Sequence, residues 1–168
     1  RKGLNVIQGD ENSLNDNDYD FIHIAHLLEH IAEPQKLIAK FNRHLKNNGI
    51  LIIVIPNFNP KFYYLFSKLF GLNQWMHLPY HRFHWNKDNI KLFVENCGFE
   101  TIKVINKTPA PWKFWSLVHY YKIRNKNLMN SQLLVKLLKL LNFPLNIITD
   151  YLNSGDIIEI YCKKTRNI

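Results

Sequence analysis

The stretch from Tyr19 to Asn57 constrains the fold of this chain most, because it reads as a strand, a helix and a second strand. A short apolar run at 21–25 ends at the polar His26, and a second run, 50–55, is apolar at every position. Such runs are typical of strands, and a fully apolar one is typical of a parallel strand covered on both faces. The stretch therefore predicts a right-handed crossover between two parallel strands.

The segment between these two strands has the signals of an amphipathic helix. Pro34 suits the first helical position, where its missing N–H costs no hydrogen bond. Four apolar residues recur at helical spacing: Leu37, Ile38, Phe41 and Leu45. Asn47-Asn48-Gly49 supplies a left-handed stop. Ligands of such units bind at the carboxyl ends of the strands, so we expect a site near 26–30 and Pro56-Asn57.

Further elements flank this unit. Residues 4–8 predict a strand before it, and 102–105 and 157–162 predict two strands after it. Asn86 is suited to cap a helix that Gly98 ends. The apolar face of that helix is Ile90, Phe93, Val94 and Cys97. The chain is thus predicted to be an α/β domain.

Several motifs occur together in a fixed order. They are Tyr19-Asp20, His26-Leu27-Leu28-Glu29-His30-Ile31, Glu33-Pro34, Leu45-Lys46-Asn47-Asn48-Gly49 and Pro56-Asn57. This series resembles the middle of class I S-adenosylmethionine-dependent methyltransferases, most closely the small-molecule branch. Residues 5–10 are similar to the family's third strand and acidic turn, and His84 with 86–100 to its later helix. The resemblance covers 3–107 and returns at 156–163, and it implies a Rossmann-like sheet whose last two strands are antiparallel neighbours.

Two features of that family are missing from this sequence. No glycine-rich loop follows a first strand, since the six glycines form no G-x-G cluster, and no acidic residue ends a second strand. Arg1 is not an initiator methionine. We therefore expect residues 1–168 to be one partial methyltransferase domain that lacks the first two strands, the carboxyl-terminal two-thirds of such an enzyme.

The resemblance implies S-adenosylmethionine as the cofactor and assigns five residues to it. Asp10 would accept a hydrogen bond from the adenine amino group, and Glu11 would offer its backbone N–H to the ring. Ala25, His26 and Leu27 would line the methionine end of the cofactor. The alternative for Asp10 is a cap on its own turn.

The run from His77 to Trp85 is the densest group of polar and aromatic side chains. His81 and Tyr80 are candidates for a general base or acceptor contact, and His77, Arg82 and His84 for substrate binding. The resemblance also implies that His84-Trp85 leads into the next helix and is partly structural. His26 and His30, and His81 and His84, have spacings that metal ligands use, but no third ligand is apparent. We therefore expect no metal site, and expect Glu29 and His30 to fix their loop by hydrogen bonds.

Two insertions interrupt the predicted domain. Residues 58–85 carry an aromatic helical stripe. The resemblance implies a lid over the acceptor for this segment, and the alternative is packing onto the sheet. Residues 109–153 carry tryptophan, tyrosine and lysine beside a leucine face. That combination suits peripheral contact with a membrane, although a helical cap or a dimer contact is the favoured interpretation.

Composition limits the function further. The net charge of +9 permits anionic partners, but it is spread along the chain, and most aromatics fall on helical stripes, which counts against nucleic acid. Two cysteines without a CxxC motif fit a reducing cytoplasm. The sequence predicts methyl transfer to a small-molecule, sugar or lipid-linked acceptor. The alternative is a non-catalytic module of the same fold that binds a membrane surface or another anionic partner.

Overall fold

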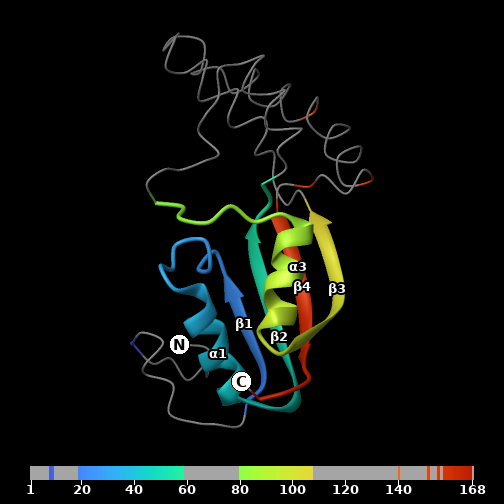
Figure 1. Cartoon of the computed structure of the whole chain (residues 1–168). Coiled ribbons are helices and arrows are strands. Elements are labelled where there is room, and N and C mark those ends of the chain that lie inside the picture. Colours follow the sequence, from blue (N-terminus) through green and yellow to red (C-terminus); the bar gives the residue numbers. More distant parts are fainter. Residues whose placement is uncertain are drawn as a thin grey trace.

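Residues 19–56 form the strand–helix–strand unit that the sequence predicts. In this computed structural model, which describes residues 8–9, 19–58, 80–107, 140, 151, 155 and 157–167, the unit comprises strand β1 (Tyr19–Ala25), helix α1 (Pro34–His44) and strand β2 (Leu45–Pro56). Strands β1 and β2 lie side by side and are parallel (Figure 1). Ala25 is the register partner of Val54. The predicted parallel pair is confirmed.

Three later elements complete the sheet. Helix α3 (Lys87–Asn96) precedes strand β3 (Phe99–Lys107), and strand β4 (Ile157–Lys164) follows much later in the chain. Strand β4 lies between β2 and β3 and is antiparallel to both, so the order is β1-β2-β4-β3. The α/β class and the antiparallel pairing of the last two strands are confirmed.

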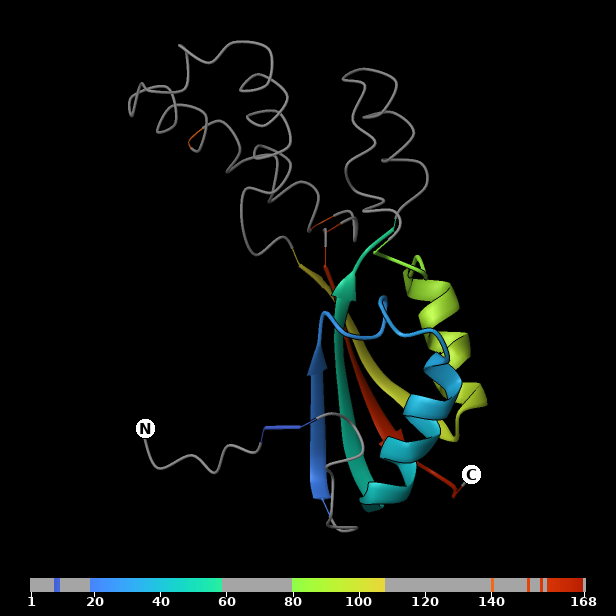
Figure 2. The same ribbon diagram turned by 90° about the vertical axis from the view of Figure 1, so that its left-hand side faces the viewer.

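Both helices lie on the same face of the sheet (Figure 2). The strand residues beneath them are fully buried: Leu51, Ile53 and Ile55 from β2, and Ile158, Ile160 and Cys162 from β4. The alternate residues of β2, among them Ile52 and Val54, are only half-buried. The prediction that this strand is covered on both faces is therefore wrong for the described part of the chain. Its second neighbour is antiparallel, and no described helix covers its other face.

The second face of the sheet carries a polar network instead. The Tyr161 hydroxyl donates a hydrogen bond to the Glu159 carboxylate, and Lys107 Nζ lies 2.9 Å from its other oxygen. These two hydrogen bonds hold the pKa of Glu159 below its ordinary value, and the one from Tyr161 has the larger effect. The polar residues of β4, which alternate with its buried apolar ones, therefore lie on this second face.

Helix α3 begins and ends as predicted. The Asn86 side chain accepts hydrogen bonds from the backbone N–H groups of Asp88 and Asn89, at 3.0 and 2.9 Å. The Asn89 side chain accepts one in return from the Asn86 N–H, at 2.7 Å, which completes a capping box. Gly98 follows with a φ of 78°, a left-handed conformation that glycine adopts without strain.

Helix α1 ends earlier than the predicted stop. Its last residue is His44, and Leu45 is already extended. The left-handed residue is Asn48, with a φ of 64°, and it lies where the pairing of β1 with β2 shifts register. Gly49 is required there because a Cβ would lie 2.9 Å from the Lys46 carbonyl oxygen. The Asn-Asn-Gly signal thus marks an irregularity in β2 rather than the helix end.

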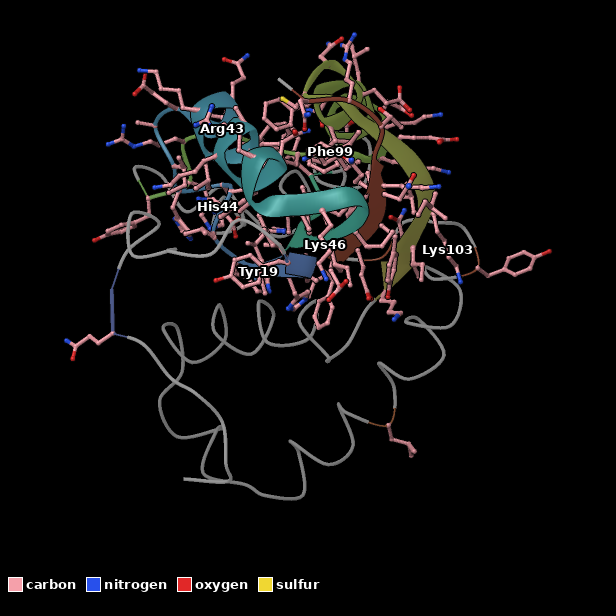
Figure 3. The ribbon with its side chains drawn as sticks, turned by 90° about the horizontal axis from the view of Figure 1, so that it is seen from below. Tyr19, Arg43, His44, Lys46, Phe99 and Lys103 are labelled. Atoms are coloured by element: carbon pink, nitrogen blue, oxygen red, sulfur yellow. The ribbon has the colours of Figure 1, made fainter. Side chains whose placement is uncertain are left out.

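The opposite end of the molecule from the predicted site is basic. Seen from below, Arg43 and His44 lie at the end of α1, and Lys46 and Tyr19 lie near the start of the parallel pair (Figure 3). Lys46 Nζ is 2.8 Å from Asp20 Oδ1, which joins the second residues of β1 and β2 at the surface. Such an exposed pair contributes little to stability.

A buried lysine ties α1 to β4. Lys164 is 5% exposed, and its Nζ donates to the carbonyl oxygens of Asn42 and Leu45, at 2.6 and 2.7 Å. The Asn42 side chain donates in turn to the carbonyls of Arg166 and Cys97, at 3.0 and 3.4 Å. The last carbonyls of α1 are satisfied in this way, at the helix end that favours a cation.

Both cysteines lie in the core as predicted, and both are free thiols. Burial raises the pKa of Cys97 above its ordinary value and that of Cys162 to about 12. Since the thiolate is the reactive form, we expect a thiol reagent at pH 8 to modify both far more slowly in the folded chain than in urea. A colorimetric thiol titration measures this, and rapid labelling of either cysteine in the folded chain would contradict it.

The raised pKa of Cys162 also makes the free energy of unfolding depend on pH. Burial raises the pKa of the Cys162 thiol from its ordinary value of 9.0 to about 12, so its proton is bound more strongly in the folded chain. Its contribution to stability is complete below pH 9 and is lost progressively as the pH rises towards 12.

Several predicted elements lie outside the described residues. They are the strand at 4–8 apart from Gln8, most of 58–85, and nearly all of 109–153. In the described part of the chain, no helix has the length and apolar character needed to cross a membrane.

Candidate functional site

The carboxyl end of β1 turns into a loop of residues 26–33, which we call the β1–α1 loop. His26 makes that turn with a φ of 50°, and its backbone N–H donates to the Val54 carbonyl at 2.9 Å. A left-handed conformation is uncommon for a residue with a side chain, and outliers of this kind cluster at functional sites. The hydrogen bond fixes His26 beside the carboxyl end of β2.

A second segment, residues 80–86, crosses this edge of the sheet above the β1–α1 loop (Figure 1). The N–H groups of Arg82 and Phe83 both donate to the Glu29 carbonyl, at 2.8 and 3.3 Å. His30 Nδ1 lies 3.0 Å from the Tyr80 carbonyl oxygen. Three hydrogen bonds therefore hold the crossing segment to the loop, although about fifty residues separate them in sequence.

The contact between the two segments gathers ionisable side chains around Glu29. Glu29 is 1% exposed, and neither carboxylate oxygen has a hydrogen-bond partner among the described residues. His26 Nδ1 and His30 Nε2 lie 3.4 and 3.9 Å from its Oε1. His81 is next to His30, with ring centroids 4.9 Å apart. A buried carboxylate thus has imidazole rings from both segments close to it.

Sequence reasoning missed this cluster. It predicted that Glu29 and His30 fix the loop by hydrogen bonds. The His30 ring does form such a bond. In Glu29 the backbone carbonyl accepts the hydrogen bonds, and the side chain has none among the described residues. Sequence reasoning also found no third ligand for a metal. The ligand atoms of Glu29, His30 and His81 in fact lie within 4.8 Å of one another. Only the fold reveals this, because no local spacing relates 29–30 to 81.

The other predicted site residues fall into three groups. Ala25, His26 and Leu27 are exposed at the carboxyl edge of β1, and Tyr80 and Arg82 are exposed on the crossing segment. His84 is half-buried and its ring packs on Phe58, with centroids 5.0 Å apart, which fits its expected structural part. Asp10, Glu11 and His77 lie outside the described residues.

Trp85 anchors the crossing segment to the helix layer. It is 6% exposed, stacks on Phe83 at 5.7 Å and contacts the Phe93 ring of α3 at 5.0 Å. Its carbonyl accepts a hydrogen bond of 2.6 Å from the Phe58 N–H, just beyond β2. This buried contact with α3 fits the structural part that the resemblance implies for His84-Trp85.

The end of β2 is fixed by a second close contact. Asn57 donates a hydrogen bond of 2.7 Å to the Gly155 carbonyl, shortly before β4. A Cβ on Gly155 would lie 2.7 Å from backbone atoms of Lys107, so only glycine fits. The carboxyl ends of β1 and β2 are therefore held in place by specific contacts. The small Ala25 side chain, several imidazoles and a buried carboxylate lie at this edge of the sheet. Imidazoles there can take up a proton or bind a cation or an anionic ligand.

The chain is similar to known methyltransferases in sequence profile and in fold. The sequence profile of the methyltransferase domain family matches residues 4–104. A search of curated protein sequences finds no significant match. Solved structures of similar fold include a SAM-dependent methyltransferase from Archaeoglobus fulgidus (TM-score 0.54, 18% identity, 97% of this chain and 69% of that one).

Two further solved structures are similar over nearly the whole chain. One is a putative methyltransferase from Bacillus halodurans (TM-score 0.53, 17% identity, 95% of this chain and 71% of that one). The other is a putative methyltransferase in complex with the Trm112 activator from Haloferax volcanii (TM-score 0.53, 11% identity, 95% and 60%). The chain spans only 57% and 54% of two other similar chains. At these identities the likeness concerns the fold.

Proposed function

This chain belongs to the methyltransferase domain family, and on that premise we propose that it takes part in S-adenosylmethionine-dependent methyl transfer to a small-molecule, sugar or lipid-linked acceptor. The observation that carries the proposal is the edge where the β1–α1 loop and the crossing segment meet. In open α/β sheets, ligands bind outside the carboxyl ends of the strands. The two segments that bear the candidate residues meet at that edge.

The cofactor residues proposed on β1 fit such a ligand. Ala25, His26 and Leu27 are consecutive and all accessible, and the small Ala25 side chain leaves room close to the strand end. The hydrogen bond from His26 to Val54 holds their backbone in place. Asp10 and Glu11 would hold the adenine. When bound, the cofactor supplies an electrophilic methyl group.

The acceptor residues are proposed on the crossing segment. Tyr80 is 75% exposed and Arg82 is also exposed, so both can contact a molecule that arrives from solvent. His81 is half-buried beside His30, where an imidazole can take a proton from an acceptor hydroxyl or ammonium group. His77 and Arg82 would bind an anionic part of the acceptor. Most of the catalytic effect would come from positioning.

We expect S-adenosylhomocysteine to bind the chain, and Ala25→Arg to weaken that binding at least tenfold, because a long charged side chain would fill the space at the strand end. Isothermal titration calorimetry measures both affinities. His23→Arg is the matched control, since His23 is an exposed residue of the same strand two positions earlier. Its affinity should equal that of the unsubstituted chain.

Other results of the S-adenosylhomocysteine titration distinguish an incomplete cofactor site from a non-catalytic module. Binding only by a chain lengthened at its amino terminus would mean that the cofactor site needs residues outside this sequence. No binding by either chain would contradict the proposal and favour the non-catalytic module. For that module, attraction to anionic vesicles that falls with added salt would be the positive sign.

A further inference from the structure

We propose that Glu29, His30 and His81 bind a divalent transition-metal ion, with Zn²⁺ as its natural probe. The site uses none of the side chains assigned to the cofactor, and it shares only His81 with the proposed acceptor site. Two imidazoles and one carboxylate form a donor set that zinc and other first-row divalent ions prefer. Sequence spacing alone had argued against any metal.

Glu29 is the first reason for the proposal. Its carboxylate is almost completely removed from solvent, yet both oxygens are without a hydrogen bond in the described part of the chain. Burying a charged carboxylate without compensation is costly, so buried carboxylates are normally paired, hydrogen-bonded or bound to a metal. The nearest described ion-pair partner is the His26 ring, at 3.4 Å, and that side chain is half exposed. A metal ion would satisfy both oxygens directly.

The His30 ring is the second reason. Its Nδ1 is 3.0 Å from the Tyr80 carbonyl, and a carbonyl can only accept, so Nδ1 carries the proton. In the neutral ring, Nε2 then has its lone pair free, and Nε2 is the atom on the Glu29 side, 3.9 Å from Oε1. An imidazole whose other nitrogen donates to a backbone carbonyl is the usual arrangement of a metal-bound histidine.

The geometry requires only a small closure. With bonds of about 2.1 Å, the ligand atoms of a tetrahedral zinc lie about 3.4 Å apart. The three ligand atoms here lie within 4.8 Å of one another, and rotation of exposed side chains such as His30 can bring them closer. The backbone bonds from Arg82 and Phe83 to Glu29 already hold the two segments together. His30 is exposed and His81 is half-buried, so both rings are accessible to an ion in solution.

The experiment is a titration of the full chain with Zn²⁺ and with Co²⁺, whose absorption spectrum reports its ligands. We expect one ion per chain, a nitrogen- and oxygen-ligated Co²⁺ spectrum, and no comparable binding of Mg²⁺. His81→Ala and Glu29→Gln should each weaken Zn²⁺ binding by more than about tenfold. His23→Ala is the control, because His23 is exposed on β1 and outside the cluster, and its affinity should be unchanged.

Equal affinities in His81→Ala, Glu29→Gln and His23→Ala would place the ion elsewhere and overturn the proposal. So would the absence of a ligand-derived Co²⁺ spectrum from the unsubstituted chain, a result that needs no variant to fold. Circular dichroism verifies that each variant keeps its structure. S-adenosylhomocysteine titration of His81→Ala keeps this question separate from the proposed function: lost metal binding with retained cofactor binding supports the metal site alone.

Discussion

Lys164→Met is expected to lower the free energy of unfolding by about 2–4 kcal/mol. Methionine fills a similar volume but cannot donate to the carbonyls of Asn42 and Leu45, which Lys164 reaches at 2.6 and 2.7 Å. These carbonyls would stay buried without a partner, and the end of α1 would lose a favourable cation. Urea denaturation measures the effect as a lower midpoint with an unchanged slope.

The chain provides a matched control at the next position. Lys163→Met is the same chemical change, but Lys163 points to the second face of the sheet and is only half-buried. Its effect should stay within about 0.5 kcal/mol. If the two variants had equal stability, the two hydrogen bonds of Lys164 would contribute no more than a surface side chain does.

The order of strands and helices could be predicted from the sequence because local signals agreed with each other. Pro34 at the start of α1, the Asn86 N-cap and Gly98 after α3 are all short-range features, and each occurs where it was expected. Apolar periodicity placed the cores of β2 and β4 within a few residues of their observed bounds. Boundaries were less exact, as the early end of α1 shows.

The burial of β2 could not be predicted in the same way. Six successive apolar residues, 50–55, look alike in the sequence, but half of them face α1 and α3 and half face the other side. Apolarity sets which residues can be buried, whereas the position of the helices decides which are. The buried Lys164 shows the reverse case, since a lysine in an alternating strand reads as solvent-facing until the end of α1 is seen beside it.

Some residues of the candidate site could be predicted from the sequence and others could not. Residues at the ends of the strands, such as His26, could be located from the strand pattern and the rule for ligand sites in α/β sheets. The cluster of Glu29, His30 and His81 could not, because it depends on hydrogen bonds between segments about fifty residues apart. A close contact of distant segments leaves no periodic trace in one sequence.

Trp85→Ala is expected to have the second large effect, a loss of about 3–5 kcal/mol in the free energy of unfolding. Trp85 is 6% exposed between the rings of Phe83 and Phe93, so its removal leaves a large cavity beside α3. Thermal or urea denaturation measures the loss. Trp85→Phe is the control: it keeps a ring in place and removes an indole N–H that has no hydrogen-bond partner among the described residues, so it should cost only about 1 kcal/mol.

The same substitution tests whether Trp85 positions the site. Hydrogen exchange of the Arg82 and Phe83 amides reports the two bonds to the Glu29 carbonyl, and these bonds hold the crossing segment on the β1–α1 loop. In Trp85→Ala both amides should lose protection by more than the global loss of stability explains, because the segment can open locally once its anchor is gone. In Trp85→Phe they should keep it. Equal protection in the two variants would mean that the loop alone holds the segment, and that His81 stays beside His30 without help from the helix layer.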